Sequence, residues 1–172
     1  MGYHAKNRRV KQSYSSHIFE GIDQFMTEMR MVKVVETYSD ILQVLKRYAT
    51  YLESLKNNKD LTELAIKFKD NATTVELVDN NNHIGFAVFY RNNYTDRVAY
   101  ITRIAIAPEF RRKGNASMLL EAIRKLSLDN GMELLKLEVD DSNVGAKKLY
   151  EHMGFRKESK SKPGHSYWIK HI

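Results

Sequence analysis

The chain has 172 residues, 42% of them hydrophobic and 28% charged, which is the size and composition of one folded domain. It contains no cysteine, which excludes disulfides, thiolate zinc sites and cysteine nucleophiles. The formal net charge is +7, with basic clusters in residues 111–125 and 156–172. Such clusters can bind an anionic cofactor or nucleic acid, or can serve only to keep the protein soluble. No motif of a known nucleic-acid-binding fold accompanies them.

Neither a membrane span nor a secretory leader is evident. No run reaches the roughly 18 apolar residues of a span, and residues 1–30 lack the apolar core of a signal peptide. We therefore expect a soluble, cytoplasmic protein. Residues 1–30 show little hydrophobic period, which predicts a flexible N-terminal arm with a short helical turn near Ile22 to Met29. The folded domain is expected over residues 31–172.

The first elements of this domain are a short strand and two helices. Met31 to Glu36 predicts the strand, and Ser39 and Asp40 offer caps for the first helix. A turn is expected over residues 56–59, and Asp60 begins a shorter helix through Phe68. The first helix has a core-facing stripe at helical spacing, formed by Ile41, Val44, Leu45, Tyr48, Leu52 and Leu55.

The next elements are three strands and a helix. Thr73–Val78 and His83–Tyr90 flank a group of turn formers, which predicts a β-hairpin. Val98–Ile106 is too apolar for an edge strand, so we place it in the middle of the sheet. An amphipathic helix follows from Ala116 to Leu126 and ends at Asn130 and Gly131.

The C-terminal part alternates strands with one more helix. Leu134–Val139 predicts a strand, Asn143–Met153 a helix, and a final pair of strands follows from Phe155 onward, including Ser166–Ile169. No internal repeat or low-complexity segment interrupts this order. The pattern is that of a mixed α/β domain.

A basic loop joins the strand Val98–Ile106 to the helix that follows it. Pro108 ends the strand, Arg111, Arg112 and Lys113 follow, and Gly114 lies at the tight point before the helix starts. Free backbone N–H groups and the helix dipole there favour a phosphate or pyrophosphate. The alternative is a helix that merely begins after a basic loop. The Walker and G-x-G-x-x-G spacings are absent, which disfavours a nicotinamide cofactor.

Further motifs follow downstream in a fixed order. The loop reads R-x-x-G-x-A over residues 111–116, L-E-V begins at Leu137, and S-N-x-x-A-x-x-L-Y-E-x-x-G-F runs from Ser142 to Phe155. In this combination the chain resembles the GNAT superfamily of acyl-coenzyme A dependent N-acetyltransferases, most strongly over Tyr100–Phe155. The resemblance implies a single α/β domain with a mostly antiparallel central sheet flanked by helices.

The resemblance also implies acetyl-coenzyme A as co-substrate, with no metal. Arg111 to Ser117 would bind its pyrophosphate, while the backbone of Ile104 to Ile106 and the side chain of Asn143 would hold the pantetheine arm. Tyr150 lies two helical turns after Asn143, so both side chains share one face of a helix. The implied contacts are Ile104, Ala105, Ile106, Arg111, Arg112, Lys113, Gly114, Asn115, Ala116, Ser117, Asn143 and Tyr150.

Two residues are implied to act in catalysis by the same resemblance. Tyr150 would be the general acid that protonates the departing thiolate, and an ordinary core tyrosine is the alternative. Glu138 would be the base; a solvated strand carboxylate or a chain of water molecules are the alternatives. Strand alternation puts Glu138 on one face with Leu134 and Lys136. His83 and His165 could also serve, but no spacing singles them out.

The leading hypothesis is an N-acetyltransferase that moves an acetyl group from acetyl-coenzyme A to a primary amine by direct attack in a ternary complex. A non-catalytic module that binds or senses acyl-coenzyme A is the alternative, and a nucleic-acid binder ranks below both. A small-molecule amine, an amino sugar and a protein amine all stay open as acceptor, with the acceptor region expected between Tyr90 and Arg103. The sequence leaves a homodimer open.

Overall fold

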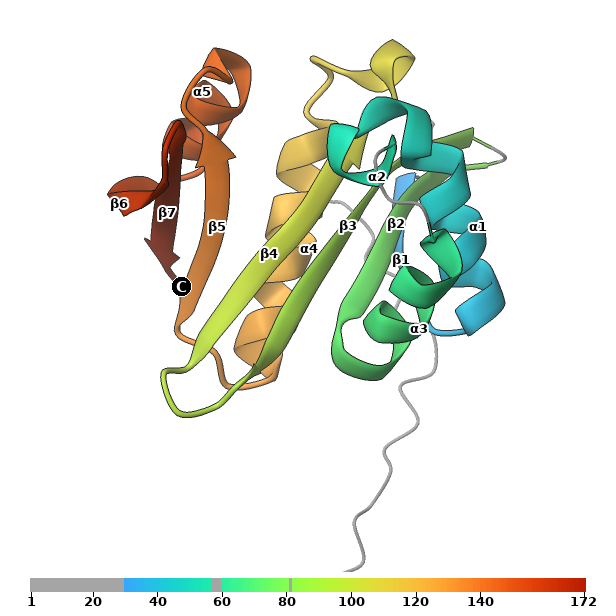
Figure 1. The fold of residues 1–172 in the computed structure, drawn as a ribbon, viewed down its shortest axis with the longest axis horizontal. Coiled ribbons are helices and arrows are strands. Elements are labelled where there is room, and N and C mark those ends of the chain that lie inside the picture. The colour runs from blue at the N-terminus through green and yellow to red at the C-terminus, as the bar shows by residue number, and fades with distance from the viewer. Residues whose placement is uncertain (1–29, 57–59, 81) are drawn as a thin grey trace, which may run out of the picture.

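The computed structural model describes residues 30–56, 60–80 and 82–172, and these form one seven-stranded sheet with helices on both faces (Figure 1). The predicted arm, its helical turn and most of the turn at residues 56–59 lie outside the described residues. The elements are β1 (Arg30–Val35), α1 (Tyr38–Tyr48), α2 (Glu53–Lys56), α3 (Leu61–Asn71), β2 (Thr73–Asp79), β3 (Asn82–Asn93), β4 (Val98–Ile106), α4 (Asn115–Asp129), β5 (Leu134–Asp140), α5 (Val144–His152), β6 (Arg156–Lys162) and β7 (His165–His171).

The strand order is β1-β2-β3-β4-β5-β7-β6. Every pair is antiparallel except β4 with β5. The predicted mixed α/β domain with a mostly antiparallel sheet is therefore confirmed, and so is the central position of the apolar strand β4. The predicted β2–β3 hairpin is also confirmed.

Helices cover the two faces of the sheet unequally. Figure 1 shows α1, α2 and α3 in front of β1–β3, whereas α4 lies behind the sheet. The core on the α4 side includes side chains of β4, β5 and α5, whereas the core on the α1 side lies between residues 35 and 107 and includes none from β5 or α5. In the view of Figure 1, the segment at α2 lies in front of the end of β4, and no described helix is drawn in front of β5.

The first helix differs from its prediction at both ends. Its N-cap is Thr37 rather than Ser39 or Asp40, because Thr37 Oγ1 accepts a hydrogen bond from the Asp40 N–H at 3.1 Å. The helix ends at Tyr48, and a 3₁₀ turn, Ala49–Tyr51, leads to extended backbone at Leu52. The continuous helix predicted to Leu55 was therefore wrong.

Helix α3, the second helix predicted from the sequence, begins where predicted. Asp60 Oδ1 accepts hydrogen bonds from the N–H groups of Thr62 and Glu63, at 2.8 and 3.1 Å. These contacts satisfy two of the first-turn donors that a helix leaves free. The helix runs to Asn71, three residues beyond the predicted end at Phe68.

A β-bulge in β4 changes which side chains face each core. Val88 pairs with Arg103, but Phe89 pairs with Ile101, so Thr102 is an extra residue in β4. Ala99 and Ile101 belong to the core on the α4 side before the bulge, and Ile104 and Ile106 do so after it. Tyr100 and Arg103 consequently share the opposite face of the sheet.

No helix within the described ranges is both long and apolar enough to cross a membrane.

Candidate active site

Strands β4 and β5 pair along only part of their length. Their parallel register runs from Val98 with Leu134 to Ile101 with Leu137 and ends there. Beyond that point the edge of β4 that faces β5 has no strand partner, and Figure 1 shows the two strands diverging. The end of the pairing coincides with the bulge at Thr102. The sheet therefore opens at its centre with unpaired backbone along β4.

A cavity of about 650 Å³ lies beside this opening. Its volume is typical of a site for a small molecule or cofactor. It is bounded by the end of β4, the loop after it, the first turn of α4 and one face of α5. Of the twelve predicted coenzyme A contacts, eleven line it: Ile104, Ala105, Ile106, Arg111, Arg112, Gly114, Asn115, Ala116, Ser117, Asn143 and Tyr150.

The loop before α4 is a turn with two left-handed residues at the start of a helix. Gly114 is the N-cap of α4 with φ of 77°, and no side chain caps the helix. Arg112 also has a positive φ, of 59°. Left-handed residues turn successive N–H groups toward one concave side, and the helix dipole adds partial positive charge there. Because Gly114 carries no Cβ, the turn forms without the strain that another residue would meet.

Two side chains hold this loop in place from within. Asn115 is 2% exposed, and its Nδ2 donates to the Phe110 carbonyl at 2.7 Å while its Oδ1 accepts from Arg30 at 3.2 Å. The Arg111 Nε donates to the Ile106 carbonyl at 3.0 Å. The Arg111 bond ties the loop to the end of β4, and the Asn115 bonds join it to Phe110 and to β1, so the side chain of Asn115 has a structural role.

Asn143 and Tyr150 reach the same cavity from α5, as their spacing predicts. Asn143 is the N-cap of α5, where its Oδ1 accepts from the Ala146 N–H at 3.0 Å. Its Nδ2 is therefore the part of the side chain that is left for a ligand. Both residues belong to one element, so the geometry between them is set by the helix.

Tyr150 combines burial with a hydroxyl that has no hydrogen bond to any residue in the described ranges. The side chain is 7% exposed and packs edge-on against Phe155, with ring centroids 5.6 Å apart. Burial raises the pKa of Tyr150 from 10.0 to about 12. The phenol therefore stays protonated at neutral pH and can donate a hydrogen bond into the cavity.

Glu138 lies on β5 but does not line the cavity. Its neighbours Leu137 and Val139 are buried in the core on the α4 side, so Glu138 faces the other side of the sheet. The Lys162 ammonium lies 3.0 Å from Glu138 Oε1. This contact lowers the pKa of Glu138, and Ser161 and His165 add to the effect. Glu138 is thus ionised at neutral pH but weakly basic.

The remaining candidates lie elsewhere. Lys113 does not line the cavity, and its Nζ lies 5.7 Å from the centre of the Phe110 ring. His83 contacts Glu76 at 2.9 Å, and His165 contacts the Pro163 carbonyl at 3.3 Å. No cluster of three or more acidic or histidine side chains that could hold a metal ion occurs within residues 30–56, 60–80 and 82–172.

Sequence reasoning missed part of the cavity wall. Tyr51 and Leu52 line the cavity because α1 ends before them. The continuous helix that we predicted gave no reason to expect them there. The only signal was weak: Thr50 and Tyr51 are poor helix formers. The other lining residues not predicted as contacts are Phe110, Gly145, Ala146 and Leu149.

Two curated relatives match parts of the chain. Thialysine N-epsilon-acetyltransferase of Sus scrofa is 29% identical over 86 residues, which cover 49% of this chain and 51% of that protein. N-alpha-acetyltransferase of Saccharolobus solfataricus is 42% identical over 62 residues, which cover 36% of this chain and 37% of that protein. The chain thus spans about half of the pig protein and less of the archaeal one.

Solved structures share the fold over most of the chain. The ribosomal-protein-S18-alanine N-acetyltransferase of Escherichia coli has a TM-score of 0.69 at 22% identity, covering 84% of this chain and 94% of that one. PaiA N-acetyltransferase of Thermoplasma acidophilum, solved in complex with coenzyme A, has a TM-score of 0.63 at 16% identity, covering 82% and 99%. At these identities the likeness establishes the fold alone.

A family model gives the assignment of the chain. The model described as the acetyltransferase (GNAT) family matches residues 38–155, which is more than half of the chain. The matched range includes the open β4–β5 edge, the loop before α4 and the cavity face of α5. This protein therefore belongs to the GNAT family of acetyltransferases.

Proposed function

We propose that this protein is an N-acetyltransferase that moves an acetyl group from acetyl-coenzyme A to a primary amine. The observation that carries the proposal is the convergence on one cavity of an uncapped helix N-terminus, an unpaired strand edge and a buried, protonated tyrosine. Each of these suits a different part of acetyl-coenzyme A. Relatives whose names specify N-acetylation support the same chemistry.

The residues present fit this co-substrate in charge and shape. The N–H groups at the start of α4 and the turn at Arg112 and Gly114 suit the pyrophosphate. The unpaired edge of β4 suits the amide-containing pantetheine arm, which can hydrogen-bond as a short strand would. The Nδ2 of Asn143 offers this arm one further donor. We therefore assign the cavity to acetyl-coenzyme A.

Tyr150 is proposed as the general acid. In direct transfer the amine nitrogen bonds to the thioester carbon, the carbon–sulfur bond breaks, and the sulfur leaves with the bonding electrons. A protonated phenol in the cavity can donate its hydrogen bond, and then its proton, to that sulfur. The raised pKa of Tyr150 keeps the phenol in the donating form. The amine must give up its own proton on the other side of the carbonyl carbon.

Glu138 is the proposed acceptor of that amine proton, directly or through water. It lies on β5 just beyond the last β4–β5 pair, on the face opposite to Tyr150. An acid and a base on opposite faces of an open sheet suit a reaction in which the amine and the thiol lie on opposite sides of one carbonyl carbon. Because its pKa is lowered, Glu138 can accept a proton only as the nitrogen becomes cationic during attack.

The acceptor is proposed to be a small-molecule amine. Names of relatives that specify thialysine and the alanine of a ribosomal protein indicate that both small and protein amines occur among similar proteins. The cytoplasmic location and the homodimer stay predictions.

Incubation with acetyl-coenzyme A and a panel of amines, followed by detection of free thiol and acetylated amine, tests the proposal. Thiol release that depends on both the protein and one class of amine is the expected result. If acetyl-coenzyme A raises the melting temperature but no amine releases thiol, the protein is a binding or sensing module. If it neither binds nor reacts, the assignment of the cavity is wrong.

A further inference from the structure

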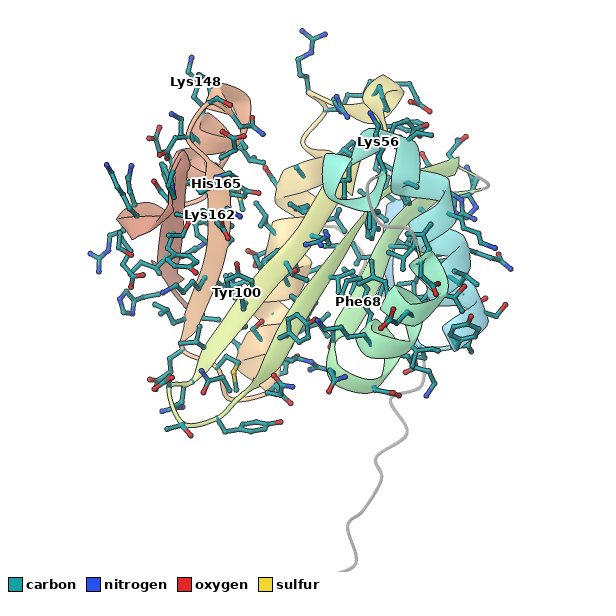
Figure 2. All side chains as sticks on the ribbon, viewed as in Figure 1. Lys56, Phe68, Tyr100, Lys148, Lys162 and His165 are labelled. Carbon is teal, nitrogen blue, oxygen red and sulfur yellow. The ribbon has the colours of Figure 1, made fainter. Side chains whose placement is uncertain are left out.

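The face of β4 and β5 opposite to α4 carries a group of polar and aromatic side chains. Tyr90, Tyr100 and Arg103 come from β3 and β4, and Glu138 and Lys162 come from β5 and β6. Figure 2 shows Tyr100 near the point where β4 and β5 diverge. It shows Lys162 and His165 above Tyr100 in the same view. Among the described residues, the helices on this side, α1, α2 and α3, lie over the N-terminal strands in Figure 1, and we place the approach of the acceptor on the face of β4 and β5 beside them.

The lysines on this face are already matched with carboxylates. The Lys136 Nζ lies 2.7 Å from Glu158 Oε2 and 4.4 Å from the centre of the Tyr167 ring. The Lys162 Nζ lies 3.0 Å from Glu138 Oε1. These two ion pairs leave no net charge.

Arg103 has no such carboxylate partner among the described residues. It is partly buried, and no carboxylate of the described residues lies within ion-pair distance of its guanidinium. Its Nη1 donates to the carbonyl and the hydroxyl of Thr102, at 2.7 and 3.0 Å, while its Nε is buried without a hydrogen-bond partner in the described part of the chain. Tyr90 and Tyr100 are the titratable side chains whose charges act on the pKa of Arg103.

An unmatched, partly buried cation is costly unless a ligand supplies the counter-charge. Burial lowers the pKa of Arg103, which reflects this cost. A guanidinium recognises a carboxylate through paired, charge-assisted hydrogen bonds. A phosphate monoester carries about two negative charges, more than one guanidinium balances.

We propose that Arg103 binds a carboxylate of the acceptor, so that the amine substrate is a small amino acid. This inference rests on the proposed function and narrows its acceptor to amines that also carry a carboxylate. Arg103 acts as a specificity-determining residue on the side of the sheet opposite to Tyr150. The position follows from the bulge at Thr102, which puts Arg103 and Tyr100 on one face.

Paired substrates that differ by one carboxylate test the inference: lysine with cadaverine, ornithine with putrescine, and phenylalanine with phenethylamine. The wild-type protein is expected to favour the amino acid of at least one pair by about 10-fold or more in kcat/KM. The Arg103→Gln variant should lose most of this preference, through a KM about 10- to 100-fold higher for the amino acid. Its kcat/KM for the matched amine should change little.

Two further variants separate recognition from folding. Arg103→Lys keeps the charge but not the paired geometry, so it should recover only part of the preference. Arg156→Gln removes an exposed arginine elsewhere on the sheet and should leave the preference intact. Calorimetric titration of each variant with the amino acid, in the presence of coenzyme A, gives affinities that do not depend on turnover.

The outcomes distinguish this inference from the proposed function. Equal kcat/KM values within every pair, or equal effects of Arg103→Gln on both members, would overturn the role of Arg103 while leaving the transferase intact. Preference for a peptide over every amino acid would also overturn it. Absence of thiol release with any amine would instead count against the transferase itself.

Discussion

Glu76 is predicted to be the charged side chain on which the stability of the N-terminal half depends most. Its carboxylate is 1% exposed and contacts three basic groups: the Arg47 Nη1 at 2.6 Å, the His83 Nδ1 at 2.9 Å and the Lys33 Nζ at 3.1 Å. These contacts join α1, β1 and β3 to β2. Through Arg47 they also hold the end of α1, just before Tyr51 and Leu52 at the cavity wall.

The magnitude follows from the unequal burial of the partners. Removing one member of a buried ion pair costs about 3–5 kcal/mol. The basic side chains here are 31–50% exposed and can regain water, so we expect Glu76→Gln to cost about 2–4 kcal/mol. Lys33→Gln removes a half-exposed partner and should cost less than about 1 kcal/mol.

Urea and thermal unfolding followed by circular dichroism measure this difference. For a protein of this size, Glu76→Gln should lower the melting temperature by roughly 5–15 °C, and Lys33→Gln by about 4 °C at most. Equal losses for the two variants, or a loss below about 1 kcal/mol for Glu76→Gln, would refute the claim that burial of this carboxylate sets its importance.

Three further predictions concern the cavity. Tyr150→Phe should lower kcat by about 100-fold or more, as expected when a general acid is removed, whereas Tyr38→Phe changes a tyrosine at the start of α1 that does not line the cavity and should not; initial rates of thiol release check this. Gly114→Ala and Gly131→Ala place a Cβ at similar positive φ, 77° and 80°, with no atom within 4 Å, so both should cost about 1 kcal/mol. Of the two, only Gly114→Ala should weaken coenzyme A binding in calorimetric titration, and equal binding would contradict the anion turn. Because the pKa of Tyr150 is raised to about 12, its contribution to stability should be complete below pH 10 and be lost as pH rises through about 12. For the same reason, kcat should show no falling limb from Tyr150 below pH 10, and a Tyr150-dependent limb near neutral pH would refute this assignment.

Much of the fold could be predicted from the sequence because local patterns and tertiary packing agree. Strand β4 is mostly apolar, so a central position was predicted, and its bounds match those of the structure. Asp60 could be recognised as a cap because a carboxylate satisfies the free N–H groups of a helix start. The spacing of Asn143 and Tyr150 similarly puts both on one face of α5.

The break in α1 could not be predicted from the apolar stripe. Leu52 and Leu55 keep helical spacing with Tyr48, and Leu55 is buried although it belongs to a separate short helix. Periodicity reports which side chains are apolar, not whether the hydrogen-bond ladder between them is continuous. The two cavity residues Tyr51 and Leu52 were missed for this reason.

The bulge at Thr102 is the other feature hidden from the sequence. Regular strand alternation would put residues 100, 102 and 104 on the same face of the sheet. Because Thr102 is an extra residue, Tyr100 instead shares its face with Arg103, and Ile104 lies on the opposite face. Arg103 could therefore be placed in the acceptor region by resemblance, but only the structure shows that no carboxylate of the described residues pairs with it.

The central claim is that acetyl passes directly from acetyl-coenzyme A in this cavity to an amine. The most direct measurement follows free thiol, acetylated amine and the mass of the protein in the same samples during a single turnover. Direct transfer predicts that thiol and acetylated amine appear together in equal amounts while the protein mass stays unchanged. Acetyl groups on the protein before product appears, or thiol release without acetylated amine, would contradict it.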